Sequence, residues 1–302
     1  MLYALCVVCV LCGLLARDHR MSNNLAIKIG DVGISIEGEV SGEIAPAYFP
    51  FICQGKTDIS LRLQYGIPDM VLGEKVFDSP PIWTLYRENG NFVIRLFPEM
   101  GDLQRTLFLP HHLKHADLFF ANDCIRFIDP YFGPTMELLL IHYLAMERGV
   151  ILHACGIVIE DSGILFLGES GAGKSTLARM WAQENGVDIL SDDRVIVRKQ
   201  GSEFRIYGTP WHGEAAFGSP REARLERIFF LRHGQENSVK EMKGLDPVSH
   251  LLTCSFPPLW DSQGMEFALE FFSQLAAQIP CQELSFRPEK SALALVKKIS
   301  KW

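Results

Sequence analysis

The stretch GILFLGESGAGKSTLARM, residues 163–180, decides how the rest of the chain is interpreted. An apolar run leads into GESGAGKS, residues 168–175, which fits the pattern G-x-x-x-x-G-K-[ST]. Glycines in such a loop let consecutive backbone N–H groups point at phosphate oxygens, and the helix that follows adds positive partial charge at its N-terminus. The pattern predicts a buried strand, a loop that binds a nucleoside triphosphate, and a helix. A plain turn between a strand and a helix is the alternative.

The same loop carries two side chains suited to ATP and Mg²⁺. Lys174 is expected to reach the β- and γ-phosphates, and the Ser175 hydroxyl is expected to be a Mg²⁺ ligand. The predicted nucleotide-binding residues are Gly168, Glu169, Ser170, Gly171, Ala172, Gly173, Lys174, Ser175 and Thr176.

Two adjacent carboxylates, Asp192 and Asp193, end the segment VDILSDD at residues 187–193. A strand tip beside a phosphate loop is where a Mg²⁺-binding carboxylate must lie. One carboxylate can hold the metal while the other accepts a proton from an attacking hydroxyl. The pair therefore predicts phosphoryl transfer, with a solvated acidic turn as the alternative.

His153 lies in LHACG, residues 152–156, on a strand expected to pair with the one that feeds the loop. It could hydrogen-bond one of the aspartates or the γ-phosphate. A histidine in a buried strand can equally be a core residue with its hydrogen bonds satisfied, and the residues alone leave both interpretations open.

The composition is that of a soluble globular protein. The chain has 302 residues, of which 48% are hydrophobic, and a net charge of −7, so nothing resembles a basic nucleic-acid-binding surface. Five of the eight cysteines stand singly among apolar neighbours, which predicts reduced thiols and a cytoplasmic protein. The other three, Cys6, Cys9 and Cys12, have no second cluster to complete a metal site.

The apolar run at residues 2–16 is short for a membrane span and lacks the basic start of a signal peptide. We interpret residues 1–20 as a non-native start before Met21, with a weak membrane anchor as the alternative. Residues 21–134 read as a strand-rich α+β region, with Asn-Gly in RENGNFVIRLF as a hairpin signal and a strand pair in residues 117–129. Residues 135–302 read as an α/β catalytic domain, beginning with a buried helix at residues 135–148.

In the order His153, glycine-rich loop and Asp192–Asp193, the chain resembles the catalytic domain of HPr kinase/phosphorylase. That fold group also includes ATP-dependent phosphoenolpyruvate carboxykinase. GTPW at residues 208–211 and FFL at residues 229–231 are similar to a branch of HPr-kinase-like proteins, some of which phosphorylate a peptide serine. The resemblance implies a P-loop kinase domain using ATP and Mg²⁺, with Asp192 as general base or metal ligand, Asp193 beside it on the metal and His153 assisting the base.

The chain departs from the family where a later glycine-rich signature with an arginine is expected. YGTPWHGEAAFGSPREARLER stands there instead, which argues against dephosphorylation, hexamer formation and HPr itself as substrate. In this segment Glu214 is a candidate metal ligand, and Arg221 or Arg224 is a candidate phosphate contact, with plain surface positions as the alternative for all three.

The leading hypothesis is a Mg-ATP-dependent kinase acting on a serine of a small protein or peptide, with oligomer formation left open. A small-molecule kinase or carboxykinase-like enzyme, and a non-catalytic ATP-binding module of a peptide-modification pathway, are the alternatives.

Overall fold

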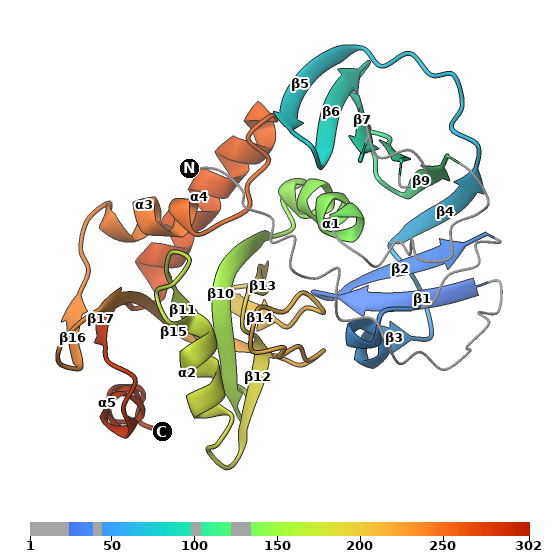
Figure 1. Ribbon diagram of the computed structural model, residues 1–302. Coiled ribbons are helices and arrows are strands. Elements are labelled where there is room, and N and C mark those ends of the chain that lie inside the picture. Colours follow the sequence, from blue (N-terminus) through green and yellow to red (C-terminus); the bar gives the residue numbers. More distant parts are fainter. Residues whose placement is uncertain (1–23, 39–43, 98–103, 122–133) are drawn as a thin grey trace. The chain divides into compact units, whose positions relative to one another are not determined.

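The computed structural model describes residues 24–38, 44–97, 104–121 and 134–302. The fold is mixed α/β, with two mixed sheets and few helices. The chain divides into two compact units, one built mainly from Val32–Leu139 and the other from Lys28–Asp31 and Leu140–Trp302. Figure 1 shows the elements of both. Among the described residues, no helix has the length and apolar character needed to cross a membrane.

The first unit contains a nine-stranded sheet in the order β3-β1-β2-β4-β9-β8-β7-β6-β5. Its elements are β1 (Asn24–Ile29), β2 (Val32–Glu37), the 3-10 helix η2 (Pro46–Phe51), β3 (Ile52–Cys53), β4 (Ile59–Tyr65), β5 (Glu74–Ser79), β6 (Trp83–Glu88), β7 (Asn91–Leu96), β8 (Arg105–Leu109) and β9 (His115–Phe120). The predicted Asn-Gly hairpin is confirmed, because Asn89 and Gly90 turn with positive φ between β6 and β7.

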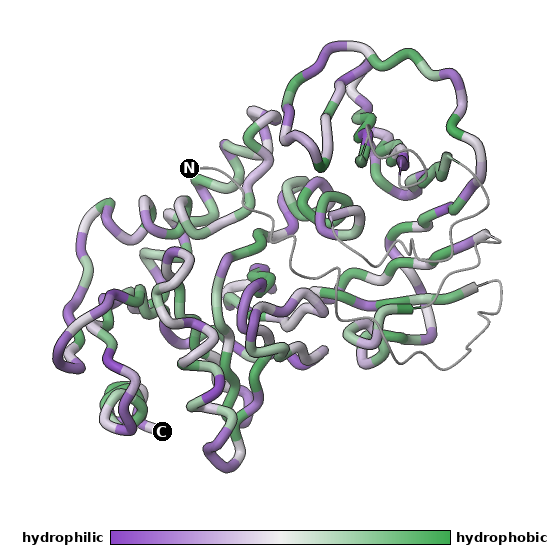
Figure 2. Tube along the Cα trace, viewed as in Figure 1, coloured by the Kyte–Doolittle hydropathy of each residue, from purple (hydrophilic) through white to green (hydrophobic). Residues whose placement is uncertain are grey.

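Some sequence predictions fall outside the described residues. These are the apolar N-terminal run, the cysteines at positions 6, 9, 12 and 124, and the second half of the strand pair expected in residues 117–129. The helix expected at residues 135–148 is α1 (Thr135–Ala145), and Figure 2 colours it as hydrophobic over most of its length.

The second unit contains an eight-stranded sheet and four further helices. Its elements are β10 (Val150–Ile159), β11 (Ser162–Leu167), α2 (Lys174–Trp181), β12 (Val187–Ser191), β13 (Arg194–Gln200), β14 (Glu203–Tyr207), β15 (Glu222–His233), β16 (Ser238–Glu241), α3 (Asp246–Thr253), α4 (Ser262–Gln278), β17 (Cys281–Phe286) and α5 (Lys290–Ser300). The strand predicted before the glycine loop is β11, the helix predicted after it is α2, and the strand predicted to carry His153 is β10.

The two faces of this sheet are covered by different helices, because successive strand residues point to opposite sides. On β10, Leu152 and Ala154 pack with α3 and α4. Cys155 and Ile157 on the same strand pack with α2 and α5. Cys155, Cys254 and Cys281 are buried free thiols, as the sequence predicts for them, whereas Cys53 is partly exposed.

Three strands of the second unit run parallel and end at one edge of the sheet. β11 pairs with β15, and β15 pairs with β17, both in parallel register. Ligands of α/β proteins bind outside the carboxyl ends of such strands. Residues 168–175 leave the end of β11 at this edge, so the sheet places the predicted loop where a ligand would be expected.

Candidate functional site

The glycine loop, residues 168–175, joins the buried strand β11 to α2 (Figure 1). Gly171 has φ +84° and Gly173 has φ +102°, a left-handed conformation that glycine adopts without steric cost. Gly173 also lies against β17, because a Cβ at this position would stand 2.9 Å from Phe286 Cε1. Only glycine therefore suits position 173 on both grounds.

The start of α2 has no side-chain cap and no acidic residue in its first turn. The first N–H groups of a helix have no partner within the helix, so this N-terminus can receive an anion. Ser170 and Gly171 are exposed, as are Glu169 and Thr176, whereas Ala172 is buried. The loop thus has an exposed outer surface and a packed base.

Lys174 lies folded back onto its own loop. Its Nζ donates hydrogen bonds to Gly168 O at 2.7 Å and Glu169 O at 3.1 Å. Burial lowers the pKa of Lys174 from 10.5 to about 8. Among the described residues no carboxylate forms an ion pair with this ammonium, which donates to two backbone oxygens of its own loop.

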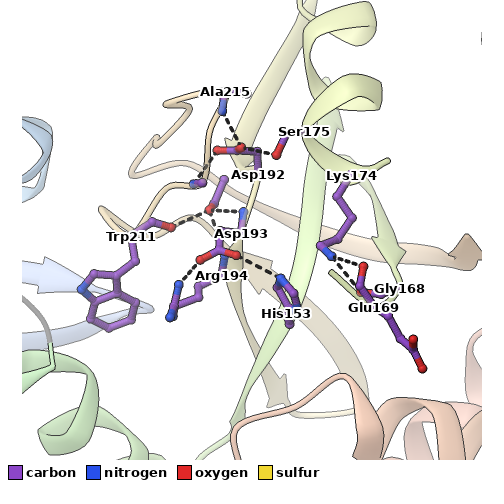
Figure 3. A network of polar contacts seen from close by, with 12 residues as sticks. His153, Gly168, Glu169, Lys174, Ser175, Asp192, Asp193, Arg194, Trp211 and Ala215 are labelled. Carbon is purple, nitrogen blue, oxygen red and sulfur yellow. Dashed lines mark hydrogen bonds and ion pairs between the residues drawn. The ribbon is translucent and has the colours of Figure 1, made fainter. Parts of the chain in front are cut away.

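Asp192 joins the glycine loop to a second loop, residues 213–217 (Figure 3). Its Oδ2 accepts from Ser175 Oγ at 2.8 Å and Ala215 N at 2.9 Å, and its Oδ1 accepts from Gly213 N at 2.9 Å and Phe217 N at 3.3 Å. The side chain is buried, with 1% of its surface exposed. Four donors occupy the four acceptor positions of one carboxylate.

Asp193 points to the other side of the same strand tip, where His153 and Arg194 meet it (Figure 3). His153 Nε2 lies 3.0 Å from Asp193 Oδ1, and Arg194 Nη1 pairs with Asp193 Oδ2. Burial, with Lys174 and Arg194 nearby, lowers the pKa of His153 to about 3. The imidazole is therefore neutral near pH 7, and its Nε2–H donates to Asp193.

The strand pairing explains why these groups meet. β10 pairs antiparallel with β11, as predicted, and with β13 on its other side, where His153 stands opposite Arg194. Asp192 and Asp193 form the connection between β12 and β13. The structure thus brings His153, the two aspartates and Ser175 to the middle of β10, beside the carboxyl end of β11.

Ser191 and two residues of the GTPW segment, Thr209 and Trp211, hold this strand tip. Ser191 Oγ accepts from the backbone N–H groups of Asp193 and Arg194 and donates to Trp211 O at 2.8 Å. Thr209 Oγ1 donates to Arg194 O at 2.6 Å. The GTPW segment at residues 208–211 therefore supports the aspartate pair. The sequence did not predict this contact, because the segment is far from the aspartates along the chain.

Position 213 requires glycine because the backbone passes close to the Asp192 carboxylate. A Cβ at this position would lie 2.8 Å from Asp192 Oδ2, within the contact distance of two nonbonded atoms. The loop can reach the carboxylate with its backbone only because this residue has no side chain.

Glu214 is the candidate metal ligand of the loop at residues 213–217. Glu214 is exposed, and its backbone oxygen accepts from Arg179. Its neighbours Gly213 and Ala215 donate to Asp192, so Glu214 lies in the loop beside the aspartates, and its role as a metal ligand stays a prediction.

The structure places Arg221 and Arg224, the candidate phosphate contacts, away from the glycine loop. Arg221 pairs with Asp188 and donates to Glu160 O, and Arg224 stands opposite Ser162 at the start of β11. The glycine loop follows the opposite end of that strand, about 17 Å away at roughly 3.3 Å per residue. Both arginines occupy surface positions, the alternative that the sequence left open.

Comparisons with known proteins add little to this site. No protein-family profile and no curated protein matches the chain. Among solved structures, the HPr(Ser) kinase/phosphatase from Coxiella burnetii is similar at 13% sequence identity with a TM-score of 0.30, over 50% of this chain and 88% of that one. A likeness of this size carries no weight for function.

Proposed function

We propose that the second unit is a Mg-ATP-dependent phosphotransferase that transfers the γ-phosphate to a serine hydroxyl of a small protein or peptide. One observation carries the proposal: Ser175 Oγ and Asp192 Oδ2 meet at 2.8 Å, and Asp193 stands beside them within reach of His153. The residues thus combine a phosphate cradle with a carboxylate that can accept a proton.

The chain's own groups fit a bound nucleotide and its metal. The uncapped N-terminus of α2 and the buried Lys174 ammonium are donors for phosphate oxygens. Ser175, which Asp192 holds in place, supplies a hard oxygen atom of the kind Mg²⁺ prefers, and such a metal draws its remaining ligands from phosphates and water. When bound, Mg²⁺ neutralises charge on the phosphoryl group in transfer.

We assign the two aspartates different roles. Asp192 is almost fully buried, and its four acceptor positions are occupied by donors from two loops, so it orients Ser175 and residues 213–217. The Asp193 side chain is 21% exposed, and neutral His153 donates to one of its oxygens. Asp193 is therefore the general base, which takes the proton of the acceptor hydroxyl as the hydroxyl oxygen bonds to the γ-phosphorus and the bond from this phosphorus to the bridging oxygen breaks, releasing ADP.

The nature of the acceptor rests on the resemblance of the motifs alone. A screen with γ-labelled ATP separates the options, because a serine-peptide library and a set of free hydroxy amino acids can be tested in parallel. Labelling confined to peptides, and lost when their serines are replaced by alanine, is the expected result.

The site is tested with three variants of the full chain. Lys174→Ala should abolish Mg-ATP binding measured by titration calorimetry, whereas Lys199→Ala, an exposed lysine bound to Gln274, should bind as the wild type does. Asp193→Asn should keep binding and lose on the order of 10²–10⁴-fold in transfer rate, as expected for removal of a general base. Unchanged binding in Lys174→Ala, or unchanged transfer in Asp193→Asn, would refute the assignment.

A further inference from the structure

A groove of about 470 Å³ lies at the surface of the second unit. It is lined by residues 235–237, which follow β15, by Arg287, which follows β17, and by one face of α5 that includes Ser291, Ala294 and Lys298. Positions 291, 294 and 298 follow helical spacing, so α5 forms one wall.

The groove lies next to the glycine loop. β15 runs past the end of β11, so that the ring of His233 contacts Gly171 O at 2.8 Å, and residue 235 is two positions further on. Gly173 packs on Phe286, and Arg287 is the next residue of the chain. The loop and the groove thus share the carboxyl edge of β11, β15 and β17.

The groove and the aspartate pair lie on opposite sides of β11. β10, which carries His153, pairs with one edge of this strand, and β15 pairs with the other. If the loop holds the phosphates of a nucleotide with the γ-phosphate toward Asp193, the nucleoside end of the molecule points toward β15 and β17.

The lining suits an uncharged polar group with flat apolar faces. Its acidic and basic side chains balance, since Glu236 and Glu289 accompany Arg287 and Lys298. Ala294 and Leu295 supply aliphatic surface on α5, and the planar Arg287 guanidinium can stack on a base. A volume of 470 Å³ falls in the usual range of small-molecule sites.

We infer that this groove holds the base and ribose of the nucleotide whose phosphates the glycine loop binds. The inference rests on the proposed function, because it needs a nucleoside triphosphate on the loop. It assigns binding of the nucleoside to the ends of β15 and β17 and to α5, and leaves the His153 side of the loop to the phosphoryl acceptor.

The test compares Mg-ATP with magnesium tripolyphosphate, which has the phosphates but no nucleoside. Wild-type protein should bind ATP at least about tenfold more tightly than tripolyphosphate, a difference of about 1.4 kcal/mol. Ala294→Phe fills the groove from an exposed helical position and should remove that preference while leaving tripolyphosphate affinity within about twofold. Ala277→Phe, at an exposed position of α4, is the matched control and should change neither affinity.

Each outcome decides between the two proposals. Equal wild-type affinities for the two ligands, or an Ala294→Phe variant that keeps its preference for ATP, would overturn the nucleoside groove while leaving the phosphate loop intact. If neither ligand binds the wild type, the proposed function itself fails and the groove assignment fails with it. The wild-type comparison needs no variant, so a folding defect in Ala294→Phe does not obscure the result.

Discussion

Replacing Asp192 by asparagine should release residues 213–217 from the strand tip. The carboxylate accepts three backbone N–H groups, from Gly213, Ala215 and Phe217, together with the Ser175 hydroxyl. An asparagine amide nitrogen cannot accept, so at least one of the three N–H groups loses its acceptor. The hydroxyl can adapt, because Ser175 can rotate to accept instead of donating.

The cost follows from these contacts. One orphaned buried N–H group costs about 1–3 kcal/mol, and the bonds that remain lose the strengthening of a charged acceptor, about 1 kcal/mol each. The sum is at least about 3 kcal/mol, which corresponds to an increase on the order of 100-fold in the population of the opened loop.

Native-state hydrogen exchange measures that population directly. In Asp192→Asn the amides of Gly213, Ala215 and Phe217 should exchange on the order of 100-fold faster than in the wild type, while amides in β10 stay protected. Asp193→Asn is the matched control, because Asp193 accepts from His153 and Arg194 and not from this loop. Unchanged exchange of the three amides in Asp192→Asn, or equal acceleration in both variants, would refute the reasoning.

Four further predictions concern neighbouring groups. The pKa of Lys174 is about 8 in the folded chain and 10.5 when unperturbed. Between pH 8 and pH 10.5 the unfolded state therefore binds more protons than the folded state. The free energy of unfolding should rise by about 3 kcal/mol over this pH range. Denaturant titrations should show this rise in the wild type and lose it in Lys174→Met. The same deprotonation should weaken phosphate binding above pH 8, and Lys174→Arg should retain affinity there because an arginine stays charged; identical pH profiles would contradict this. With a pKa near 3, His153 should show no NMR titration between pH 5 and 8, and a ring-proton shift in that window would disprove its neutral role. Gly213→Ala forces a Cβ against Asp192 and should lower stability by about 1–3 kcal/mol, so an unchanged thermal midpoint would exclude the close approach.

Much of the second unit was predictable from the sequence because its signals are local. Continuous apolar runs bounded by turn residues predicted β10 and β11, and the glycine pattern predicted the turn into α2. His153 and the aspartates were predicted as candidates by residue type. Their mutual contact was left open, because it depends on which edges of β10 pair with β11 and β13.

The two candidate arginines show where local reasoning ends. Arg221 and Arg224 follow the aspartates along the chain, yet β15 begins at the far end of β11 and reaches the glycine loop only at His233. Nothing in the sequence indicates that β15 runs parallel to β11 and therefore starts at the end of β11 that is far from the glycine loop. The residue that contacts the loop is therefore one that spacing alone would not select.

By itself, the sequence determined the conformation of the glycine loop. Gly171 and Gly173 have left-handed φ values, which glycine adopts without steric cost because it has no Cβ. It also determined which strand and helix the loop joins. Only the tertiary structure decided which donors Asp192 and Asp193 meet and how far each is buried. One carboxylate is saturated by donors from a loop more than 20 residues away, and the other is left partly exposed beside His153. The physical reason is that a carboxylate's role depends on its hydrogen-bond donors and its burial, and both come from strands that pair across the sheet.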